Sequence, residues 1–222
     1  MTILSPRVRL TGAAFVFVPA LLGVSALHGC APRAEPLRGV PAPSHLPAAD
    51  LPPEYRELVF DWSFSEGTFG ASGEGVARLA SPDSVRLDLF IGGGLGGATA
   101  WLIGDSVRTP RGAMTADVLP PPPLLWAALG RLAIGAAADT AVRVDGDTLR
   151  ADIGVTPTWR VTFASDELVR LERVDDGRMM EWVARVPGVS VRYEHETARR
   201  SLRMSITRST VVPAFDEDIW PD

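Results

Sequence analysis

In the stretch Val85-Arg86-Leu87-Asp88-Leu89, apolar and charged side chains alternate residue by residue. Successive side chains of a β-strand point to opposite faces, so a period of two is typical of a strand with one buried and one solvated face. The turn sequence Ser81-Pro82-Asp83-Ser84 precedes this stretch, and a glycine-rich loop at residues 92–97 follows it. The alternation therefore predicts a strand that lies between two turns.

The same alternation recurs on both sides of this strand, in segments that short turn sequences such as Asp145-Gly146 and Pro187-Gly188 separate. The apolar positions that share a face are Leu58, Phe60, Trp62 and Phe64; Val142 and Val144; Leu149, Ala151 and Ile153; Trp159, Val161 and Phe163; Met180, Trp182, Ala184 and Val186; Val189, Val191, Tyr193 and His195; and Leu202, Met204 and Ile206. Strands that short turns connect pair antiparallel. The sequence thus predicts an all-β domain of about nine to eleven strands, wide enough for the sheet to curl on itself or split into a sandwich.

One segment departs from the alternation and predicts a short helical insertion. Four prolines at residues 120–123 lead into Leu124-Leu125-Trp126-Ala127-Ala128-Leu129, and Gly130 follows. Proline at the start and glycine after the end favour a short, almost entirely apolar helix, which must pack on the sheet. The helix is either a core element or a lid over a cavity, and in the second case Leu125, Trp126 and Leu129 are the lid residues.

The N-terminus has the three parts of an export signal: Arg7 and Arg9, an apolar run over residues 10–27, and small residues before the cleavage point. Leu27-His28-Gly29-Cys30 resembles the lipobox of bacterial lipoprotein precursors, although His28 stands where that pattern has a small residue. Cys30 is the only cysteine of the chain, so no internal disulfide can form. We predict a signal peptide over residues 1–29 and attachment of lipid, palmitate included, to Cys30. The alternative is ordinary secretion with a free thiol.

Residues 31–53 contain seven prolines and no periodic apolar face. Such a composition is typical of an extended, disordered chain, because it cannot bury enough apolar surface to offset the loss of conformational entropy. We therefore expect a lipid-bearing Cys30 and a disordered tether over residues 30–53. A β-barrel domain follows over residues 54–210. The acidic residues 211–222 form either a tail or a last strand.

The sequence offers little for catalysis or for nucleic-acid binding. The formal net charge of −5 argues against nucleic acid as a partner. Outside the predicted signal peptide there are only two histidines, His45 and His195, and neither lies near a nucleophile motif or at metal-ligand spacing from another ligand. Gly92, Gly94 and Gly97 fit G-x-G-x-x-G, but a strand rather than a helix is predicted after them, which argues against a dinucleotide site. We expect no catalytic residues, no metal and no cofactor, and we rank a lipid or glycan hydrolase last.

The order of these parts resembles the LolA/LolB superfamily of lipoprotein carriers and receptors. The shared parts are the lipid-bearing cysteine, the proline-rich tether, a first strand with Trp62, the strand of residues 85–89 that runs into a loop with Leu95, and the Leu-Leu-Trp-Ala-Ala-Leu-Gly helix. The resemblance covers most of residues 55–208. It implies an antiparallel, incompletely closed β-barrel, a half-barrel, whose mouth a helix caps and whose apolar interior holds the acyl chains of a lipoprotein.

The predicted lipid at Cys30 matches the lipid-anchored receptor of that superfamily. The resemblance implies a protein of the cell envelope, anchored by its N-terminal lipid in the outer membrane and facing the periplasm, with lipid acyl chains or lipoproteins as partners. We expect a monomer. Leu95 takes the place of the loop residue that contacts the membrane. The residues expected to line the cavity are Phe60, Trp62, Leu87, Leu89, Trp159, Phe163, Trp182 and Tyr193. They could also fill the interior as an ordinary core, so the alternative is a scaffold or interaction lipoprotein without a lipid ligand.

Overall fold

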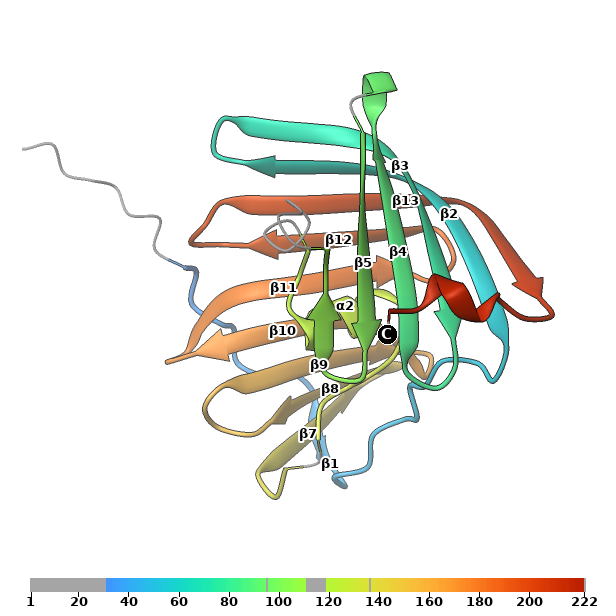
Figure 1. Ribbon diagram of the computed structural model, residues 1–222. Coiled ribbons are helices and arrows are strands. Elements are labelled where there is room, and N and C mark those ends of the chain that lie inside the picture. Colours follow the sequence, from blue (N-terminus) through green and yellow to red (C-terminus); the bar gives the residue numbers. More distant parts are fainter. Residues whose placement is uncertain (1–30, 95, 111–118, 136, 222) are drawn as a thin grey trace, which may run out of the picture.

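The computed structural model of the 222-residue chain describes residues 31–94, 96–110, 119–135 and 137–221. Its main element is a single antiparallel sheet of 13 strands in the order β1-β7-β8-β9-β10-β11-β12-β13-β2-β3-β4-β5-β6. The strands are β1 (Val40–Ala42), β2 (Tyr55–Glu66), β3 (Phe69–Ala80), β4 (Ser84–Ile91), β5 (Gly97–Ile103), β6 (Ser106–Arg108), β7 (Thr140–Asp145), β8 (Thr148–Ile153), β9 (Thr158–Ala164), β10 (Glu167–Asp175), β11 (Arg178–Val186), β12 (Ser190–His195) and β13 (Arg200–Val212). Figure 1 shows that the sheet curls so strongly that β4 and β5 run across the direction of β8–β12. The ends of the sheet, β1 and β6, do not pair, so the sheet is not closed into a barrel, which confirms the predicted half-barrel.

Hairpins connect most neighbouring strands, as the turn sequences predict. At the Asp145-Gly146 turn, Asp145 of β7 pairs with Thr148 of β8, and Gly146 adopts the positive φ of 64° that this tight turn requires. Strand β13 lies next to β2 along its whole length, and this long-range pairing joins the C-terminal half of the chain to the N-terminal half. The strand of residues 84–91 pairs with the residues after the glycine-rich loop, so that loop, which contains the 3-10 turn η1 (Gly92–Gly94), is a hairpin tip.

The helical insertion is α2 (Pro122–Ala128), which begins within the proline run as predicted. It ends before Gly130, whose φ of 96° suits glycine. All five residues from Leu124 to Ala128 are buried. They pack against one face of the sheet, and we call that face the inner face. The face on the other side of the strands is the outer face.

The N-terminal segment differs from the expectation of a disordered tether. Residues 31–53 lie along the sheet, and β1 within them pairs with β7. Ala31 and Leu51 are buried, and the Leu132 amide donates a hydrogen bond of 2.8 Å to the Ala49 carbonyl. Proline fits this arrangement because it favours extended backbone, and at the edge of a sheet its missing amide costs no hydrogen bond on the side that faces away from the sheet.

The C-terminal residues are part strand and part returning segment. Strand β13 continues to Val212, two residues beyond the expected end of the domain. The chain then turns back toward the outer face, where Glu217–Ile219 form the 3-10 turn η2. In Figure 1 this red segment lies next to β3 and β4. No helix in the described part of the chain is long and apolar enough to span a membrane.

Candidate functional site

Seven of the eight residues expected to line a cavity lie on the inner face. Six of them are at most 6% exposed: Phe60, Trp62, Leu87, Leu89, Phe163 and Tyr193. Trp159 is partly buried and packs against the same core. The alternation in β2, β4, β9 and β12 therefore predicted the inward positions correctly. That these residues contact a ligand stays a prediction.

Trp182 lies on the outer face, opposite to its expected position. The inward residues of β11 are Glu181 and Val183, which are 2% and 1% exposed. The Trp182 ring is covered by two guanidinium groups, that of Arg170 at 4.1 Å from the ring centroid and that of Arg192 at 5.3 Å. The apolar pattern of β11 is misleading because its inner face carries a carboxylate while its outer face carries an aromatic ring.

Helix α2 fills much of the inner face. Leu124 and Trp126 are fully buried, and the Trp126 indole donates a hydrogen bond of 2.7 Å to the Gly104 carbonyl. Of the three expected lid residues, Leu125 and Trp126 are buried in the core and Leu129 is half-buried. The helix is thus part of the core at the same time as it covers the sheet.

One apolar cavity opens beside the C-terminal end of α2, and we call it the α2 cavity. Its volume is about 300 Å³. Its apolar walls come from the N-terminal segment, α2 and four strands: Leu51, Leu58, Leu79, Leu129, Val191 and Ile206. Three ionisable side chains also line it: Arg56, Glu167 and Arg185. The combination of apolar walls with a few charged groups is typical of a small-molecule site.

Arg185 is the most constrained charge of the α2 cavity. Its Nη1 donates a hydrogen bond of 3.1 Å to the Leu168 carbonyl and lies so close to Gly130 that a Cβ there would approach it to 2.9 Å. Burial lowers the pKa of Arg185, and the nearby Glu167 opposes this effect in part. A guanidinium in such surroundings would gain from an anionic ligand.

A second apolar cavity of about 280 Å³ lies between the N-terminal segment and the stretch that follows α2. Leu46, Leu132, Ile134 and Ile153 are among its lining residues. None of the eight residues expected to line a cavity contributes to either of these two cavities. Of the expected site residues, only Leu129 does so.

A row of polar side chains crosses the inner face near the C-terminal end of β2 and the N-terminal end of β11. The cross-strand partners in this row are Arg173, Glu181, His195, Arg200 and Glu66. Glu181 accepts hydrogen bonds from the Tyr193 hydroxyl at 2.9 Å and from Arg173 at 3.1 Å, and Arg200 pairs with Glu66 at 2.9 Å. This row could not be predicted from the alternation, because Glu181 stands between Met180 and Trp182 and resembles an outward residue.

Burial of Tyr193 raises the pKa of its hydroxyl, and the charge of Glu181 raises it further. The hydroxyl therefore stays protonated as a hydrogen-bond donor to Glu181. His195, which the alternation placed in a strand, is the last residue of β12. Its Nδ1 accepts a hydrogen bond of 3.3 Å from the Ala198 amide.

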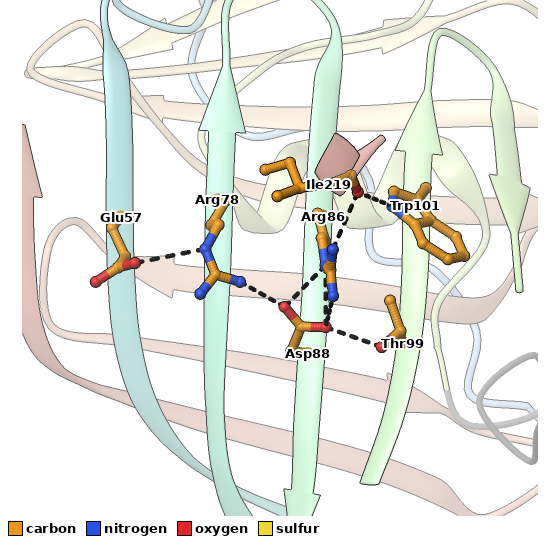
Figure 2. A network of polar contacts seen from close by, with 7 residues as sticks. All are labelled: Glu57, Arg78, Arg86, Asp88, Thr99, Trp101 and Ile219. Atoms are coloured by element: carbon orange, nitrogen blue, oxygen red, sulfur yellow. Dashed lines mark hydrogen bonds and ion pairs between the residues drawn. The ribbon is translucent and has the colours of Figure 1, made fainter. Parts of the chain in front are cut away.

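A polar network on the outer face holds the C-terminal segment (Figure 2). Asp88, only 7% exposed, accepts hydrogen bonds from Arg78, Arg86 and Thr99. Arg86 and Trp101 each donate a further bond to the Ile219 carbonyl, at 3.1 and 2.8 Å. Each of the donors to Asp88 belongs to β3, β4 or β5. This arrangement fixes η2 on the sheet.

Two expected site residues, Cys30 and Leu95, lie outside the described residues. Within the described ranges, no three His, Cys, Asp or Glu side chains are grouped so that they could hold a metal ion.

No protein-family model matches the chain, and no curated protein is similar to it in sequence. Among solved structures, it is similar to a LolA superfamily protein from Nitrosomonas europaea, with 9% identity, a TM-score of 0.45, and coverage of 78% of this chain and 93% of that protein. A DUF1329 family protein from Desulfovibrio piger gives 10% identity, a TM-score of 0.43, and coverage of 74% and 88%. A domain from Vibrio parahaemolyticus is provisionally described as an outer membrane lipoprotein-sorting protein. It gives 6% identity, a TM-score of 0.43, and coverage of 76% of this chain and 90% of that domain. These similarities do not assign the chain to a family.

Proposed function

We propose that this chain is a lipid-anchored protein of the bacterial envelope that binds acyl chains in the α2 cavity. The observation that carries the proposal is the cavity itself: an apolar opening between α2 and the inner face, with Arg56 and Arg185 among its lining residues. Each CH₂ group that leaves water for such surroundings contributes about 0.8 kcal/mol. Arg185 supplies positive charge for the carboxylate or phosphate of a lipid, whereas Arg56 is already paired with Glu54.

The size of the cavity limits the ligand. A volume of about 300 Å³ lies at the lower end of the range of small-molecule sites, so it suits part of one acyl chain. A longer chain or the lipid of a lipoprotein requires α2 to move away from the sheet. Lipid at Cys30 and an outer-membrane location facing the periplasm belong to the same proposal, and they rest on the lipobox-like sequence of residues 27–30.

Mass spectrometry of non-covalent lipid tests this proposal. The full chain is purified from membranes, and lipid that is extracted without breaking covalent bonds is quantified per protein. In Ile206→Trp the larger ring fills the α2 cavity, so we expect several-fold less lipid. The matched control is Ser205→Trp, which places the same ring on the exposed, outer side of β13 and should leave the lipid unchanged. Lipid-free protein, or equal lipid in both variants, would contradict the proposal.

A second candidate function has an observation of its own. Because Leu124 and Trp126 are fully buried against the sheet, the centre of the inner face is already filled. This favours an interaction or scaffold lipoprotein that works through its surface and carries no lipid ligand. Cross-linking in cells that finds one stoichiometric protein partner, together with lipid-free purified protein, would support this candidate instead.

A further inference from the structure

A further cavity lies on the outer face, away from the α2 cavity, and we call it the arginine pocket. Its volume is about 480 Å³. Residues 32–38 form one wall, and β8, β9, β10 and the start of β11 form the other. Five of its lining residues are arginines: Arg33, Arg38, Arg150, Arg160 and Arg170.

The wall formed by the N-terminal segment is fixed to the sheet by hydrogen bonds. The Ala34 amide donates to the Gly177 carbonyl at 2.9 Å, and the Met179 amide donates to the Pro32 carbonyl at 2.9 Å. Arg178 donates to the Ala31 carbonyl at 3.0 Å. The pocket is therefore a built feature of the fold, because its two walls are joined at the β10–β11 turn.

The charges of the pocket do not balance. Three of its arginines have acidic partners: Arg38 pairs with Glu35, Arg160 with Asp152 and Arg170 with Glu172. Arg33 and Arg150 have no acidic partner among the described residues. The structure thus concentrates two uncompensated positive charges here, although the chain as a whole is acidic.

Arg150 is the arginine of the pocket that has an unpaired buried donor. Its Nη1 atom is buried and has no hydrogen-bond partner. Leaving a charged donor buried and unpaired is costly, so buried polar groups are paired in most native structures, with a protein group, a water molecule or an ion. Thr162 is the cross-strand partner of Arg150 on one side and of Arg170 on the other, so the three residues are neighbours on the outer face.

We propose that the arginine pocket binds a phosphate group, with Arg150 as its main ligand and Arg33, Arg170 and Thr162 beside it. A phosphate offers several acceptor oxygens, which suits planar guanidinium donors and a hydroxyl around one site. The wall formed by residues 32–38 comes soon after Cys30 in the sequence, and at about 3.5 Å per residue the chain between Cys30 and Arg33 spans at most roughly 11 Å. If the anchor of the proposed function is present, the phosphate is that of a phospholipid headgroup; otherwise it is a free phosphate ester.

Calorimetric titration of the full chain with inorganic phosphate, and separately with glycerol phosphate, tests the site. We expect Arg150→Gln to weaken binding by about tenfold or more, since the amide cannot replace the charged hydrogen bonds of the guanidinium to a phosphate. The matched control, Arg203→Gln, removes the same charge from an exposed outer-face position on β13 and should leave the affinity unchanged. Absence of phosphate binding to the unaltered chain, or equal loss in both variants, overturns the proposal.

Vesicles distinguish the two sources of the phosphate. The full chain is mixed with phosphatidylcholine vesicles with or without phosphatidylglycerol, in the Arg150→Gln and Arg203→Gln forms. Extra binding to the anionic vesicles that only Arg150→Gln abolishes identifies the headgroup. Binding of soluble phosphate without this vesicle effect identifies a free phosphate ester and still supports the site. Ile206 lines the α2 cavity and not the arginine pocket, so Ile206→Trp should not change phosphate binding. The phosphate site can therefore be present even if the acyl-chain proposal fails.

Discussion

The inner and outer faces of the same sheet are held by different interactions. On the inner face Phe60, Leu102 and Val161 are at most 1% exposed and belong to one apolar core. On the outer face, arginines pair with carboxylates, such as Arg160 with Asp152 at 2.7 Å. Apolar burial supplies most of the stability of a fold, whereas an ion pair gains little beyond what it loses when its charges leave water. The outer pairs must therefore have another use.

Two outer-face arginines show what that use is. Arg86 directs Nε and Nη2 to Asp88 and its remaining Nη1 to the Ile219 carbonyl. Arg160 directs the same atoms to Asp152 and its Nη1 to the Glu35 carbonyl. In each case a carboxylate orients the guanidinium, and the free donor fixes a terminal segment of the chain. The inner face thus stabilises the sheet, while these two outer-face arginines help to attach the N- and C-terminal segments to it.

The largest effect should come from the same substitution on the two faces. Phe60→Ala removes a ring that is 1% exposed, and we expect a loss of about 3–5 kcal/mol in the free energy of unfolding. Phe90→Ala removes an outer-face ring that is 51% exposed and should cost no more than about 0.5 kcal/mol. Urea denaturation followed by tryptophan fluorescence measures both. Similar losses at the two positions would show that the faces do not differ in this way.

The alternation of apolar and polar residues predicts the inner and outer faces of a strand only where apolar side chains lie on one face and polar side chains on the other. In β2 and β4 most apolar residues face inward and most polar ones outward, so the core and the half-barrel could be predicted. In β11 the order is reversed around Glu181 and Trp182, because Arg170 and Arg192 shield the ring on the outer face. A single sequence does not show which neighbouring strand supplies such a partner.

The ends of the chain were harder to predict for a related reason. Residues 31–53 have no periodic pattern, and their order comes from pairing of β1 with β7, about 100 residues away, and from the hydrogen bond to Leu132. The arginine pocket likewise depends on the register that places Arg150, Thr162 and Arg170 next to one another. Composition and local spacing contain no information about such long-range register.

A smaller effect should follow from removal of the outer-face carboxylate that binds three donors. Asp88→Ala leaves Arg78, Arg86 and Thr99 without their shared acceptor, and we expect a loss of about 2 kcal/mol in the free energy of unfolding. The control is Asp61→Ala, an exposed carboxylate on the same face. Because Arg86 also holds Ile219, limited proteolysis of Asp88→Ala should release the C-terminal segment first. Unchanged proteolysis would show that the Asp88 network does not hold the C-terminal segment on the sheet.

The smallest effect concerns the polar exception on the inner face and depends on pH. The raised pKa of Tyr193 means that the folded protein keeps a proton that the unfolded chain loses near its ordinary pKa of about 10. Stability should therefore be unaffected below about pH 9 and should fall above pH 10, by up to about 1.4 kcal/mol per pH unit. Tyr193→Phe should remove this slope while lowering stability at neutral pH, because Glu181 then loses a donor. Tyr55→Phe, at an exposed position, is the control that should keep the slope, and urea denaturation at pH 7 to 11 compares the three proteins. A slope that survives in Tyr193→Phe would mean that another group controls the alkaline transition.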